Sequence, residues 1–113
     1  ICYDLRFPNL YKSLTKRGAD FFSIPAAFTY TTGKSHWHTL IRARAIENGC
    51  FIFAPAQCGT HKNGRKTFGH SLIVDPWGKV IAEAQNKLDV IEAQIDTELV
   101  KKVRKKIPSM TTY

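Results

Sequence analysis

The sequence predicts an α/β (α+β) fold, with helices packed on a β-sheet, for three reasons. Short apolar runs typical of buried strands alternate along the chain with amphipathic segments of helical periodicity. A connector that contains Pro and Gly, residues 75–78, separates two β-branched runs and indicates a hairpin. The 113 residues, 43% hydrophobic and 23% charged, are enough for one domain, or part of one, with a buried core.

The first elements expected are a helix and a short strand. Pro8 suits the first turn of a helix, and apolar residues at helical spacing follow it as far as Gly18, which suits a helix end. Residues 8–17 are therefore expected to be helical. Residues 21–24 then form a brief apolar run that Pro25 stops, and this run is expected to be a strand.

A second helix and a buried strand are expected next. Residues 28–34 are rich in Thr and Gly and are expected to form a loop. Ser35 then suits the N-cap of a helix over residues 35–48, with Gly49 as its end. The run that follows, 50–54, is almost wholly apolar and suits a strand that is covered on both faces.

The last part of the chain is expected to hold a hairpin, a strand and a helix. Residues 59–66 are polar and are expected to be an exposed loop, and residues 71–82 contain the hairpin. The alternation of apolar and polar residues over 90–95 predicts another strand. Asp96 is expected to cap a basic helix that runs to about Lys105.

The chain is basic, with 17 Lys and Arg against 9 Asp and Glu, which gives a formal net charge of +8. Five of the basic residues lie between Glu98 and Ile107. Cations near a helix C-terminus are favoured by the helix dipole, which explains this run without a partner. The run has no interleaved aromatic residues, so nucleic-acid binding is not expected. The alternative is a basic interaction module that binds nucleic acid or an acidic partner through this helix.

Three cysteines, an odd number, argue against a disulfide framework and indicate reduced thiols in the cytoplasm. No apolar run approaches the length of a membrane span, so no membrane partner is expected. Cys2 is the leading nucleophile candidate, because Ile1 and Cys2 resemble the end of a strand that turns toward a helix. Its alternative role is a small buried apolar residue. Cys50 is assigned to the core, and no role is assigned to Cys58.

No metal site or cofactor is expected. The spacings of His36 with His38, and of Cys58 with His61, could each supply two ligands. Zinc needs three or four ligands at characteristic spacing, and no second pair of that kind occurs. No glycine-rich phosphate loop is present.

The segment Cys2-Tyr-Asp-Leu-Arg-Phe-Pro8 resembles the nucleophile motif of the nitrilase superfamily of carbon–nitrogen hydrolases. Later blocks agree with this resemblance in order and spacing, and together they span nearly the whole chain: Pro25-Ala-Ala-Phe-Thr29, Thr32-Gly33, His36-Trp37, Arg42-Ala-Arg-Ala-Ile-Glu-Asn48, Ala56-Gln-Cys-Gly59 and Gly69-His-Ser-Leu-Ile-Val-Asp-Pro-Trp-Gly78. The similarity is closest to the branch that contains deaminated glutathione amidase and ω-amidase.

This resemblance implies an αββα four-layer sandwich that forms a homodimer through its helices and uses no cofactor. The superfamily has a catalytic Glu, Lys and Cys, and of these only the Cys matches here, as Cys2. Residues 1–113 are therefore expected to be the C-terminal portion of a single hydrolase domain whose Glu and Lys lie upstream. The chain alone is expected to be inactive.

The resemblance also implies an amidase that hydrolyses the C–N bond of a small carboxylate-bearing amide through a cysteine thioester. The substrate expected is deaminated glutathione or the ω-amide of a keto acid. The backbone N–H of Tyr3 would help to hold the oxyanion. Glu47 is expected to make a structural pair with Arg44 rather than to act as an acid.

Three further residues resemble substrate-binding positions, and each has a structural alternative. Arg6 would bind the substrate carboxylate, for which its planar fork is suited, or would pair with Asp4. Phe28 and Thr32 would line the same pocket. Core packing is the alternative for Phe28, and loop capping is the alternative for Thr32.

Overall fold

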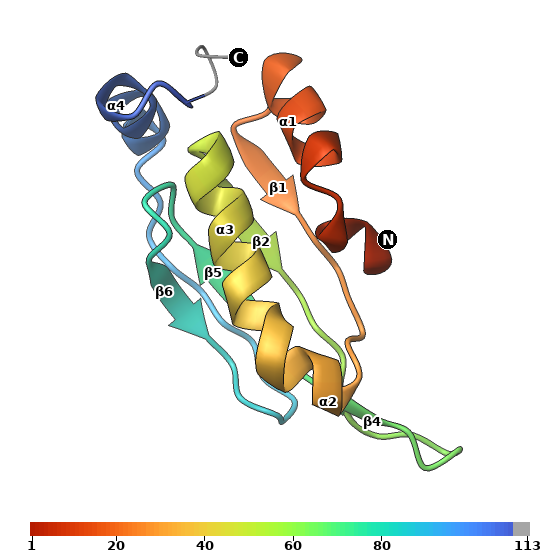
Figure 1. The fold of residues 1–113 in the computed structure, drawn as a ribbon. Helices are drawn as coiled ribbons and strands as arrows, with labels where there is room; N and C mark the ends of the chain where they lie inside the picture. The colour runs from red at the N-terminus through yellow and green to blue at the C-terminus, as the bar shows by residue number, and fades with distance from the viewer. Residues whose placement is uncertain (110–113) are drawn as a thin grey trace.

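The computed structural model describes residues 1–109 and arranges them as helices on a mixed β-sheet (Figure 1). The helical elements are η1 (Tyr3–Arg6), α1 (Pro8–Lys16), α2 (Tyr30–Thr32), η2 (Gly33–Trp37), α3 (His38–Asn48) and α4 (Glu98–Lys106). The strands are β1 (Phe21–Ser23), β2 (Phe51–Ala54), β3 (Cys58–Thr60), β4 (Lys66–Phe68), β5 (Leu72–Val74) and β6 (Val80–Glu83). The mixed helix and strand class is confirmed.

The four-stranded sheet has the order β1-β2-β5-β6. β1 and β2 are parallel, with Phe22 opposite Ile52, whereas β2–β5 and β5–β6 are antiparallel. The expected hairpin is confirmed as β5 and β6. Its turn is closed by Asp75, whose backbone N–H donates to the carbonyl of Lys79 at 2.9 Å.

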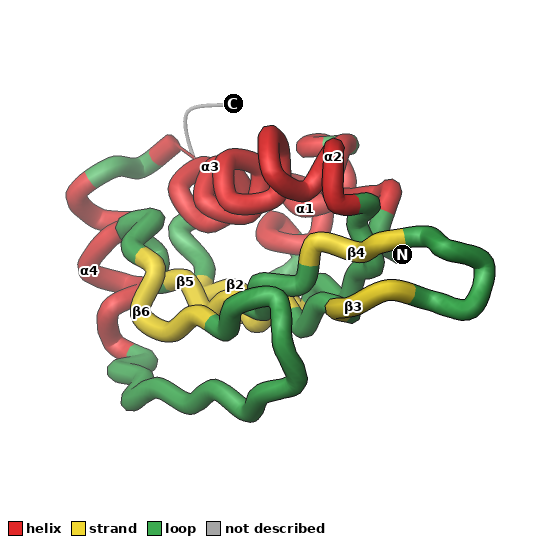
Figure 2. The backbone as a smooth tube through the Cα atoms, turned by 90° about the horizontal axis from the view of Figure 1, so that it is seen from below, coloured by secondary structure: helices red, strands yellow, loops and turns green. Residues whose placement is uncertain are grey.

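The helices α1, α2 and α3 lie on one side of the sheet, and the segment between β6 and α4 runs along the other side (Figure 2). The described residues thus supply one helical layer and one four-stranded sheet of the expected four-layer sandwich. The strand expected over 90–95 is wrong, since these residues belong to no strand. Ile91, Ala93 and Ile95 are half-buried and the residues between them are exposed, so the alternation is present. A strand also needs a paired neighbour, and none of the described backbone pairs with this segment.

The helix α1 agrees with its prediction. Pro8 is in its first turn, and Gly18 just after its end has a φ of +106°, a value that glycine adopts without strain. Tyr11 and Thr15 are its buried residues. The hydroxyl of Thr15 donates to the side-chain oxygen of Asn48 at 3.0 Å and so joins α1 to the end of α3.

The loop expected over 28–34 is wrong, because helical structure begins at Tyr30 and continues through η2 into α3. Thr29, not Ser35, is the N-cap, and its hydroxyl accepts the N–H of Thr32 at 3.4 Å. Gly33 explains the tight packing that follows, since a Cβ at this position would lie 2.3 Å from Cβ of Phe68. A threonine and a glycine that look like loop residues therefore start a helix and let it approach β4.

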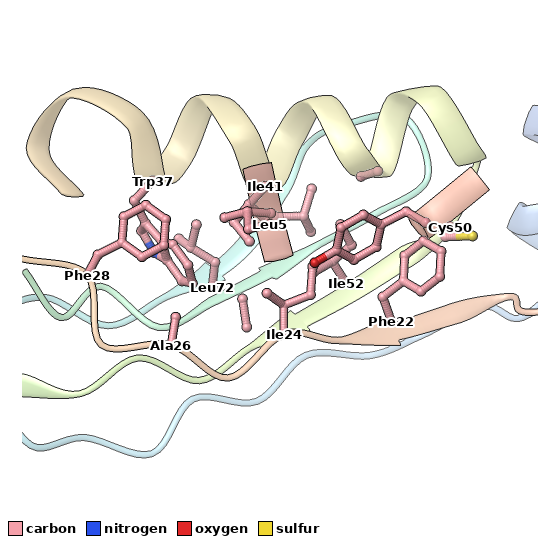
Figure 3. Packing of buried hydrophobic residues seen from close by; sticks show 14 of the residues in the cluster. Leu5, Phe22, Ile24, Ala26, Phe28, Trp37, Ile41, Cys50, Ile52 and Leu72 are labelled. Atoms are coloured by element: carbon pink, nitrogen blue, oxygen red, sulfur yellow. The ribbon is translucent and has the colours of Figure 1, made fainter. Parts of the chain in front are cut away.

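The hydrophobic core lies between α3 and the sheet (Figure 3). Trp37, Ile41 and Ile52 are fully buried in it, and the indole N–H of Trp37 donates to the carbonyl of His70 at 2.7 Å. Cys50 is also fully buried in this core, as expected.

The loop expected over 59–66 is only partly correct, because β3 and β4 pair as an antiparallel hairpin around a turn at 61–65. A single bridge joins Thr67 of β4 to Thr29, and another joins Ala56, which precedes β3, to Ala26. Each of these strands has only three residues, which is too few to show the alternation that predicts a strand.

The basic helix is present as α4, and the carboxylate of Asp96 accepts the N–H of Glu98 at 3.0 Å at its start. Arg104 is only partly exposed, and its guanidinium donates to the carboxylate of Asp20 at 2.8 Å and to the carbonyl of Ala19 at 2.8 Å. One of the five basic residues of the run is thus used to attach α4, which reduces the charge left for a basic interaction module. None of the described helices is long and apolar enough to cross a membrane.

Candidate active site

Cys2 lies at the centre of a γ-turn that leads into η1. The backbone N–H of Tyr3 donates to the carbonyl of Ile1 at 2.8 Å, and Cys2 has φ +68° and ψ −73°. This conformation costs a non-glycine residue on the order of 1–3 kcal/mol, and it persists only where the surroundings impose it. The expected strand at Ile1 and Cys2 is wrong, because the chain turns sharply there. A strained turn nevertheless places the thiol, as the sequence prediction required.

The helix α3 holds this turn in place through Arg44. The Arg44 Nε donates to the carbonyl of Leu5 at 3.0 Å, and its Nη1 donates to both carboxylate oxygens of Glu47 at 3.1 and 3.2 Å. Leu5 is itself fully buried. The predicted pair of Arg44 and Glu47 is confirmed, and one of its partners supports the turn that carries Cys2.

Two cavities meet at Cys2. A smaller cavity of about 220 Å³ is lined by Cys2, Tyr3, Arg6, Ala27, Phe28, Thr29, Thr32 and Arg65. A larger one of about 420 Å³ is lined by Ile1, Cys2, Pro25, Ala26, Ala27, Pro55, Ala56, Gln57 and Ser71. All five residues that the sequence proposed for the site therefore border the smaller cavity.

Arg6 borders this cavity, and no carboxylate of residues 1–109 forms an ion pair with it. Its guanidinium lies 5.2 Å from the centre of the Phe28 ring and 3.2 Å from His36 Nδ1. The alternative pair of Arg6 with Asp4 does not occur among the described residues. A cation held on an aromatic face at a cavity wall is suited to bind an anion.

Phe28 and Thr32 each combine the proposed role with its structural alternative. Phe28 is buried and packs against Trp37 with ring centres 5.1 Å apart, and it also lines the cavity. The hydroxyl of Thr32 lies 2.7 Å from that of Thr29, inside the cap of α2, and Thr32 also lines the cavity.

The proposed oxyanion donor is engaged in this structure. The Tyr3 N–H is bound to the carbonyl of Ile1, so it must leave that carbonyl before it can donate to a substrate oxygen. No His, Lys, Asp or Glu lines either cavity within the described residues. A base for the Cys2 thiol is therefore not supplied by these walls.

The other two thiols are placed differently. Burial raises the pKa of the Cys50 thiol, although hydrogen bonds from Thr15 and Arg104 and the charge of Arg104 act in the opposite direction. Cys58 is half-buried in β3 opposite Phe68. Of the three cysteines, only Cys2 lines the two cavities described above.

Sequence reasoning missed Arg65, which comes from the turn between β3 and β4 and borders the same cavity as Cys2 and Arg6. The basic composition of residues 61–66 is the signal that could have identified it. No group of three or more His, Cys, Asp and Glu residues in the described part of the chain could hold a metal ion.

A further cavity of about 670 Å³ lies between the β5–β6 turn and α4. Trp77, Leu99 and Val103 form its apolar part, and lysines of α4 border it. Its lining contains no cysteine, serine or threonine, so it offers no thiol or hydroxyl nucleophile for acyl transfer.

Comparisons with known proteins agree with these observations. The carbon-nitrogen hydrolase family model matches residues 1–105. A deaminated glutathione amidase of Synechocystis sp. is 51% identical over 110 residues, which are 97% of this chain and 40% of the relative. A deaminated glutathione amidase of Yersinia enterocolitica is 47% identical over 108 residues, 96% of this chain and 38% of the relative. This chain thus spans about 40% of the length of these relatives.

Solved structures of longer proteins are also similar to this chain over part of their length. The crystal structure of the Caenorhabditis elegans NitFhit protein superposes with a TM-score of 0.95 at 47% identity, and covers 99% of this chain and 27% of that one. An amidase variant of Nesterenkonia sp. AN1, with acrylamide added at its active site cysteine, superposes with a TM-score of 0.75 at 26% identity. That match covers 95% of this chain and 41% of the amidase.

Proposed function

The chain belongs to the carbon–nitrogen hydrolase family, and on that premise we propose that Cys2 is the nucleophile of an amidase that acts on a small carboxylate-bearing amide. The observation that carries this proposal is the position of Cys2 in a strained γ-turn on the wall of a cavity that also contains Arg6. A thiol fixed in this way needs little rearrangement to reach a bound carbonyl, and an adjacent cation selects an anionic substrate.

The chemistry follows from the thiol. The Cys2 sulfur, as a thiolate, attacks the amide carbonyl, and the oxygen takes up the negative charge in a tetrahedral intermediate. Collapse of this intermediate breaks the C–N bond, and the nitrogen leaves as ammonia or an amine after it accepts a proton. Water then adds to the thioester, and the carboxylic acid product and the free thiol are released. The Tyr3 N–H, once released from Ile1, would stabilise the oxyanion in both steps.

The base that accepts the thiol proton would be a glutamate, and the second oxyanion donor would be a lysine, both from sequence outside these 113 residues. In support of this, no acid, lysine or histidine lines the cavities at Cys2 within the described residues. The described part of the chain also contributes a single four-stranded sheet with one helical layer, and an extended segment lies on the other side of that sheet. These 113 residues alone would accordingly be inactive.

Deaminated glutathione, or the ω-amide of a keto acid, is the substrate class that fits best. Both bear a carboxylate that Arg6 can bind, since Arg6 makes no ion pair with an acidic side chain of the described residues. The relatives named as deaminated glutathione amidases favour the first of these substrates. The enzyme would be a cytoplasmic homodimer that needs no cofactor.

The test uses the full-length protein and measures ammonia released from 2-oxoglutaramate, or amine released from deaminated glutathione. The wild type should turn over at least one of these substrates, and Cys2→Ala should be inactive although it remains folded. Cys58→Ala is the matched control and should keep most of the activity, because Cys58 does not border the cavities. Full activity of the Cys2→Ala variant would refute the proposal.

A further inference from the structure

Arg65 is a second cation at the Cys2 cavity that the mechanism does not use. It lies in the turn between β3 and β4 and borders the cavity together with Cys2 and Arg6. Its side chain is exposed, and its Nη2 makes one long hydrogen bond, 3.5 Å, to the carbonyl of Ala27. Within residues 1–109, most of the donors of this guanidinium therefore have no partner and can bind a ligand.

The turn that carries Arg65 is held firmly against the cavity wall. The Arg65 N–H donates to the side-chain oxygen of Asn63 at 2.9 Å, and its carbonyl accepts the N–H of His61 at 2.8 Å. Thr67, which is buried, bridges to Thr29 on the cavity wall and makes a 3.0 Å hydrogen bond to the ring of His61. The backbone of Arg65 is thus fixed, and only the side chain has to adjust to a ligand.

The cavity has no internal charge that would neutralise these two arginines. Between Asp20 and Asp75 the only acidic residue is Glu47, and it pairs with Arg44. No ion pair joins Arg6 or Arg65 to a carboxylate within the described residues. Each guanidinium presents a planar fork that matches one carboxylate. A ligand with two carboxylates therefore fits a cavity with two arginines better than a ligand with a single carboxylate does.

We propose that Arg65 binds a carboxylate on the amine side of the scissile amide, while Arg6 binds one on the acyl side. The enzyme then prefers amides that carry a carboxylate on both sides of the bond over simple ω-amides. This inference rests on the proposed function of Cys2, because the two sides are defined by the carbonyl that Cys2 attacks. It makes Arg65 the residue that separates the two substrate classes named above.

A binding experiment tests this assignment independently of turnover. The probes are glutaramate and N-glutarylglycine, which differ only by a carboxymethyl group on the amide nitrogen. Their dissociation constants are measured by calorimetry with the full-length Cys2→Ala protein, in which neither probe is hydrolysed. N-glutarylglycine should bind about tenfold more tightly, as expected for one added charge-assisted contact at a partly exposed site.

Arg65→Gln in the same background should abolish this difference and leave the affinity for glutaramate unchanged. Lys62→Gln is the matched control, since Lys62 is an exposed cation in the same turn but does not line the cavity, and it should preserve the difference. An equal loss of affinity for both probes in Arg65→Gln would place Arg65 on the same carboxylate as Arg6 and overturn the inference. An unchanged preference in Arg65→Gln would overturn it as well. Failure of the wild type to hydrolyse either substrate would instead refute the proposed function, and the binding ratio would still decide the role of Arg65.

Discussion

Replacement of Arg44 by methionine should loosen the turn that carries Cys2. Arg44 is buried in α3, with 6% of its side chain exposed, and it donates to the Leu5 carbonyl in η1, which directly follows the turn. Methionine keeps the apolar stem of the side chain but removes the charge and all donors. The Leu5 carbonyl then loses its side-chain donor, and Glu47 loses its cation.

The magnitude follows from these two contacts. A buried carbonyl that loses its donor costs about 1–3 kcal/mol. The pair with Glu47 adds less than about 1 kcal/mol, because the Glu47 side chain is 47% exposed and is screened by water. Arg44→Met should therefore lower the free energy of unfolding by about 1–4 kcal/mol.

Urea unfolding of the full-length protein measures this loss, and Arg42→Met is the matched control. Arg42 lies two residues earlier in α3, is exposed, and donates to the Gly78 carbonyl at 2.8 Å, away from Cys2. Its replacement should cost less than about 1 kcal/mol and leave kcat unchanged. Arg44→Met should also reduce kcat, measured below its unfolding transition, since the nucleophile is less well fixed. Equal losses of stability and unchanged kcat in both variants would show that Arg44 does not support the turn.

Two further perturbations test the site and its surroundings. Arg6→Lys keeps the charge but loses the planar fork, so KM for a keto-acid amide should rise about tenfold. The KM for an amide without a carboxylate should be unchanged. An equal loss of kcat/KM for both amides, with a lower melting temperature, would instead show that Arg6 is a structural residue. Burial, with a smaller contribution from the Asp4 carboxylate, raises the pKa of Tyr11 to about 12, against the opposing charge of Arg44. The folded state therefore favours the neutral phenol, and this stabilisation is complete below about pH 10 and is lost as the pH rises toward 12. The urea-unfolding free energy should fall less steeply over that range in Tyr11→Phe than in the wild type, and identical slopes would contradict the assignment.

The elements that the sequence predicted correctly are those whose signals are local. Pro8 and Gly18 delimit α1, and the Pro and Gly of residues 75–78 mark the β5–β6 hairpin, as the structure confirms. The errors arose where a partner decides the outcome. Residues 90–95 alternate as a strand does but have no paired neighbour among the described residues, and the polar strands of β3 and β4 are defined only by their pairing with each other.

In the candidate site, too, residues with a local sequence signal were predicted and residues placed only by folding were missed. Cys2 and Arg6 could be chosen from the sequence because their motif is contiguous. The start of α2 was missed because Thr29 and Gly33 look like loop residues until the cap hydrogen bond and the contact with Phe68 are seen. Arg65 was missed because only the folding of the β3–β4 hairpin brings it to the cavity of Cys2.

The central claim, that Cys2 forms the acyl-enzyme, is tested most directly by trapping that intermediate. Full-length enzyme is mixed with substrate, quenched in acid within the first turnover, digested and analysed by mass spectrometry. The mass of the acyl group should appear on the peptide that contains Cys2 and should be absent from the peptides of Cys50 and Cys58. An acyl group on Cys58, or continued turnover after Cys2 has been alkylated, would contradict the account.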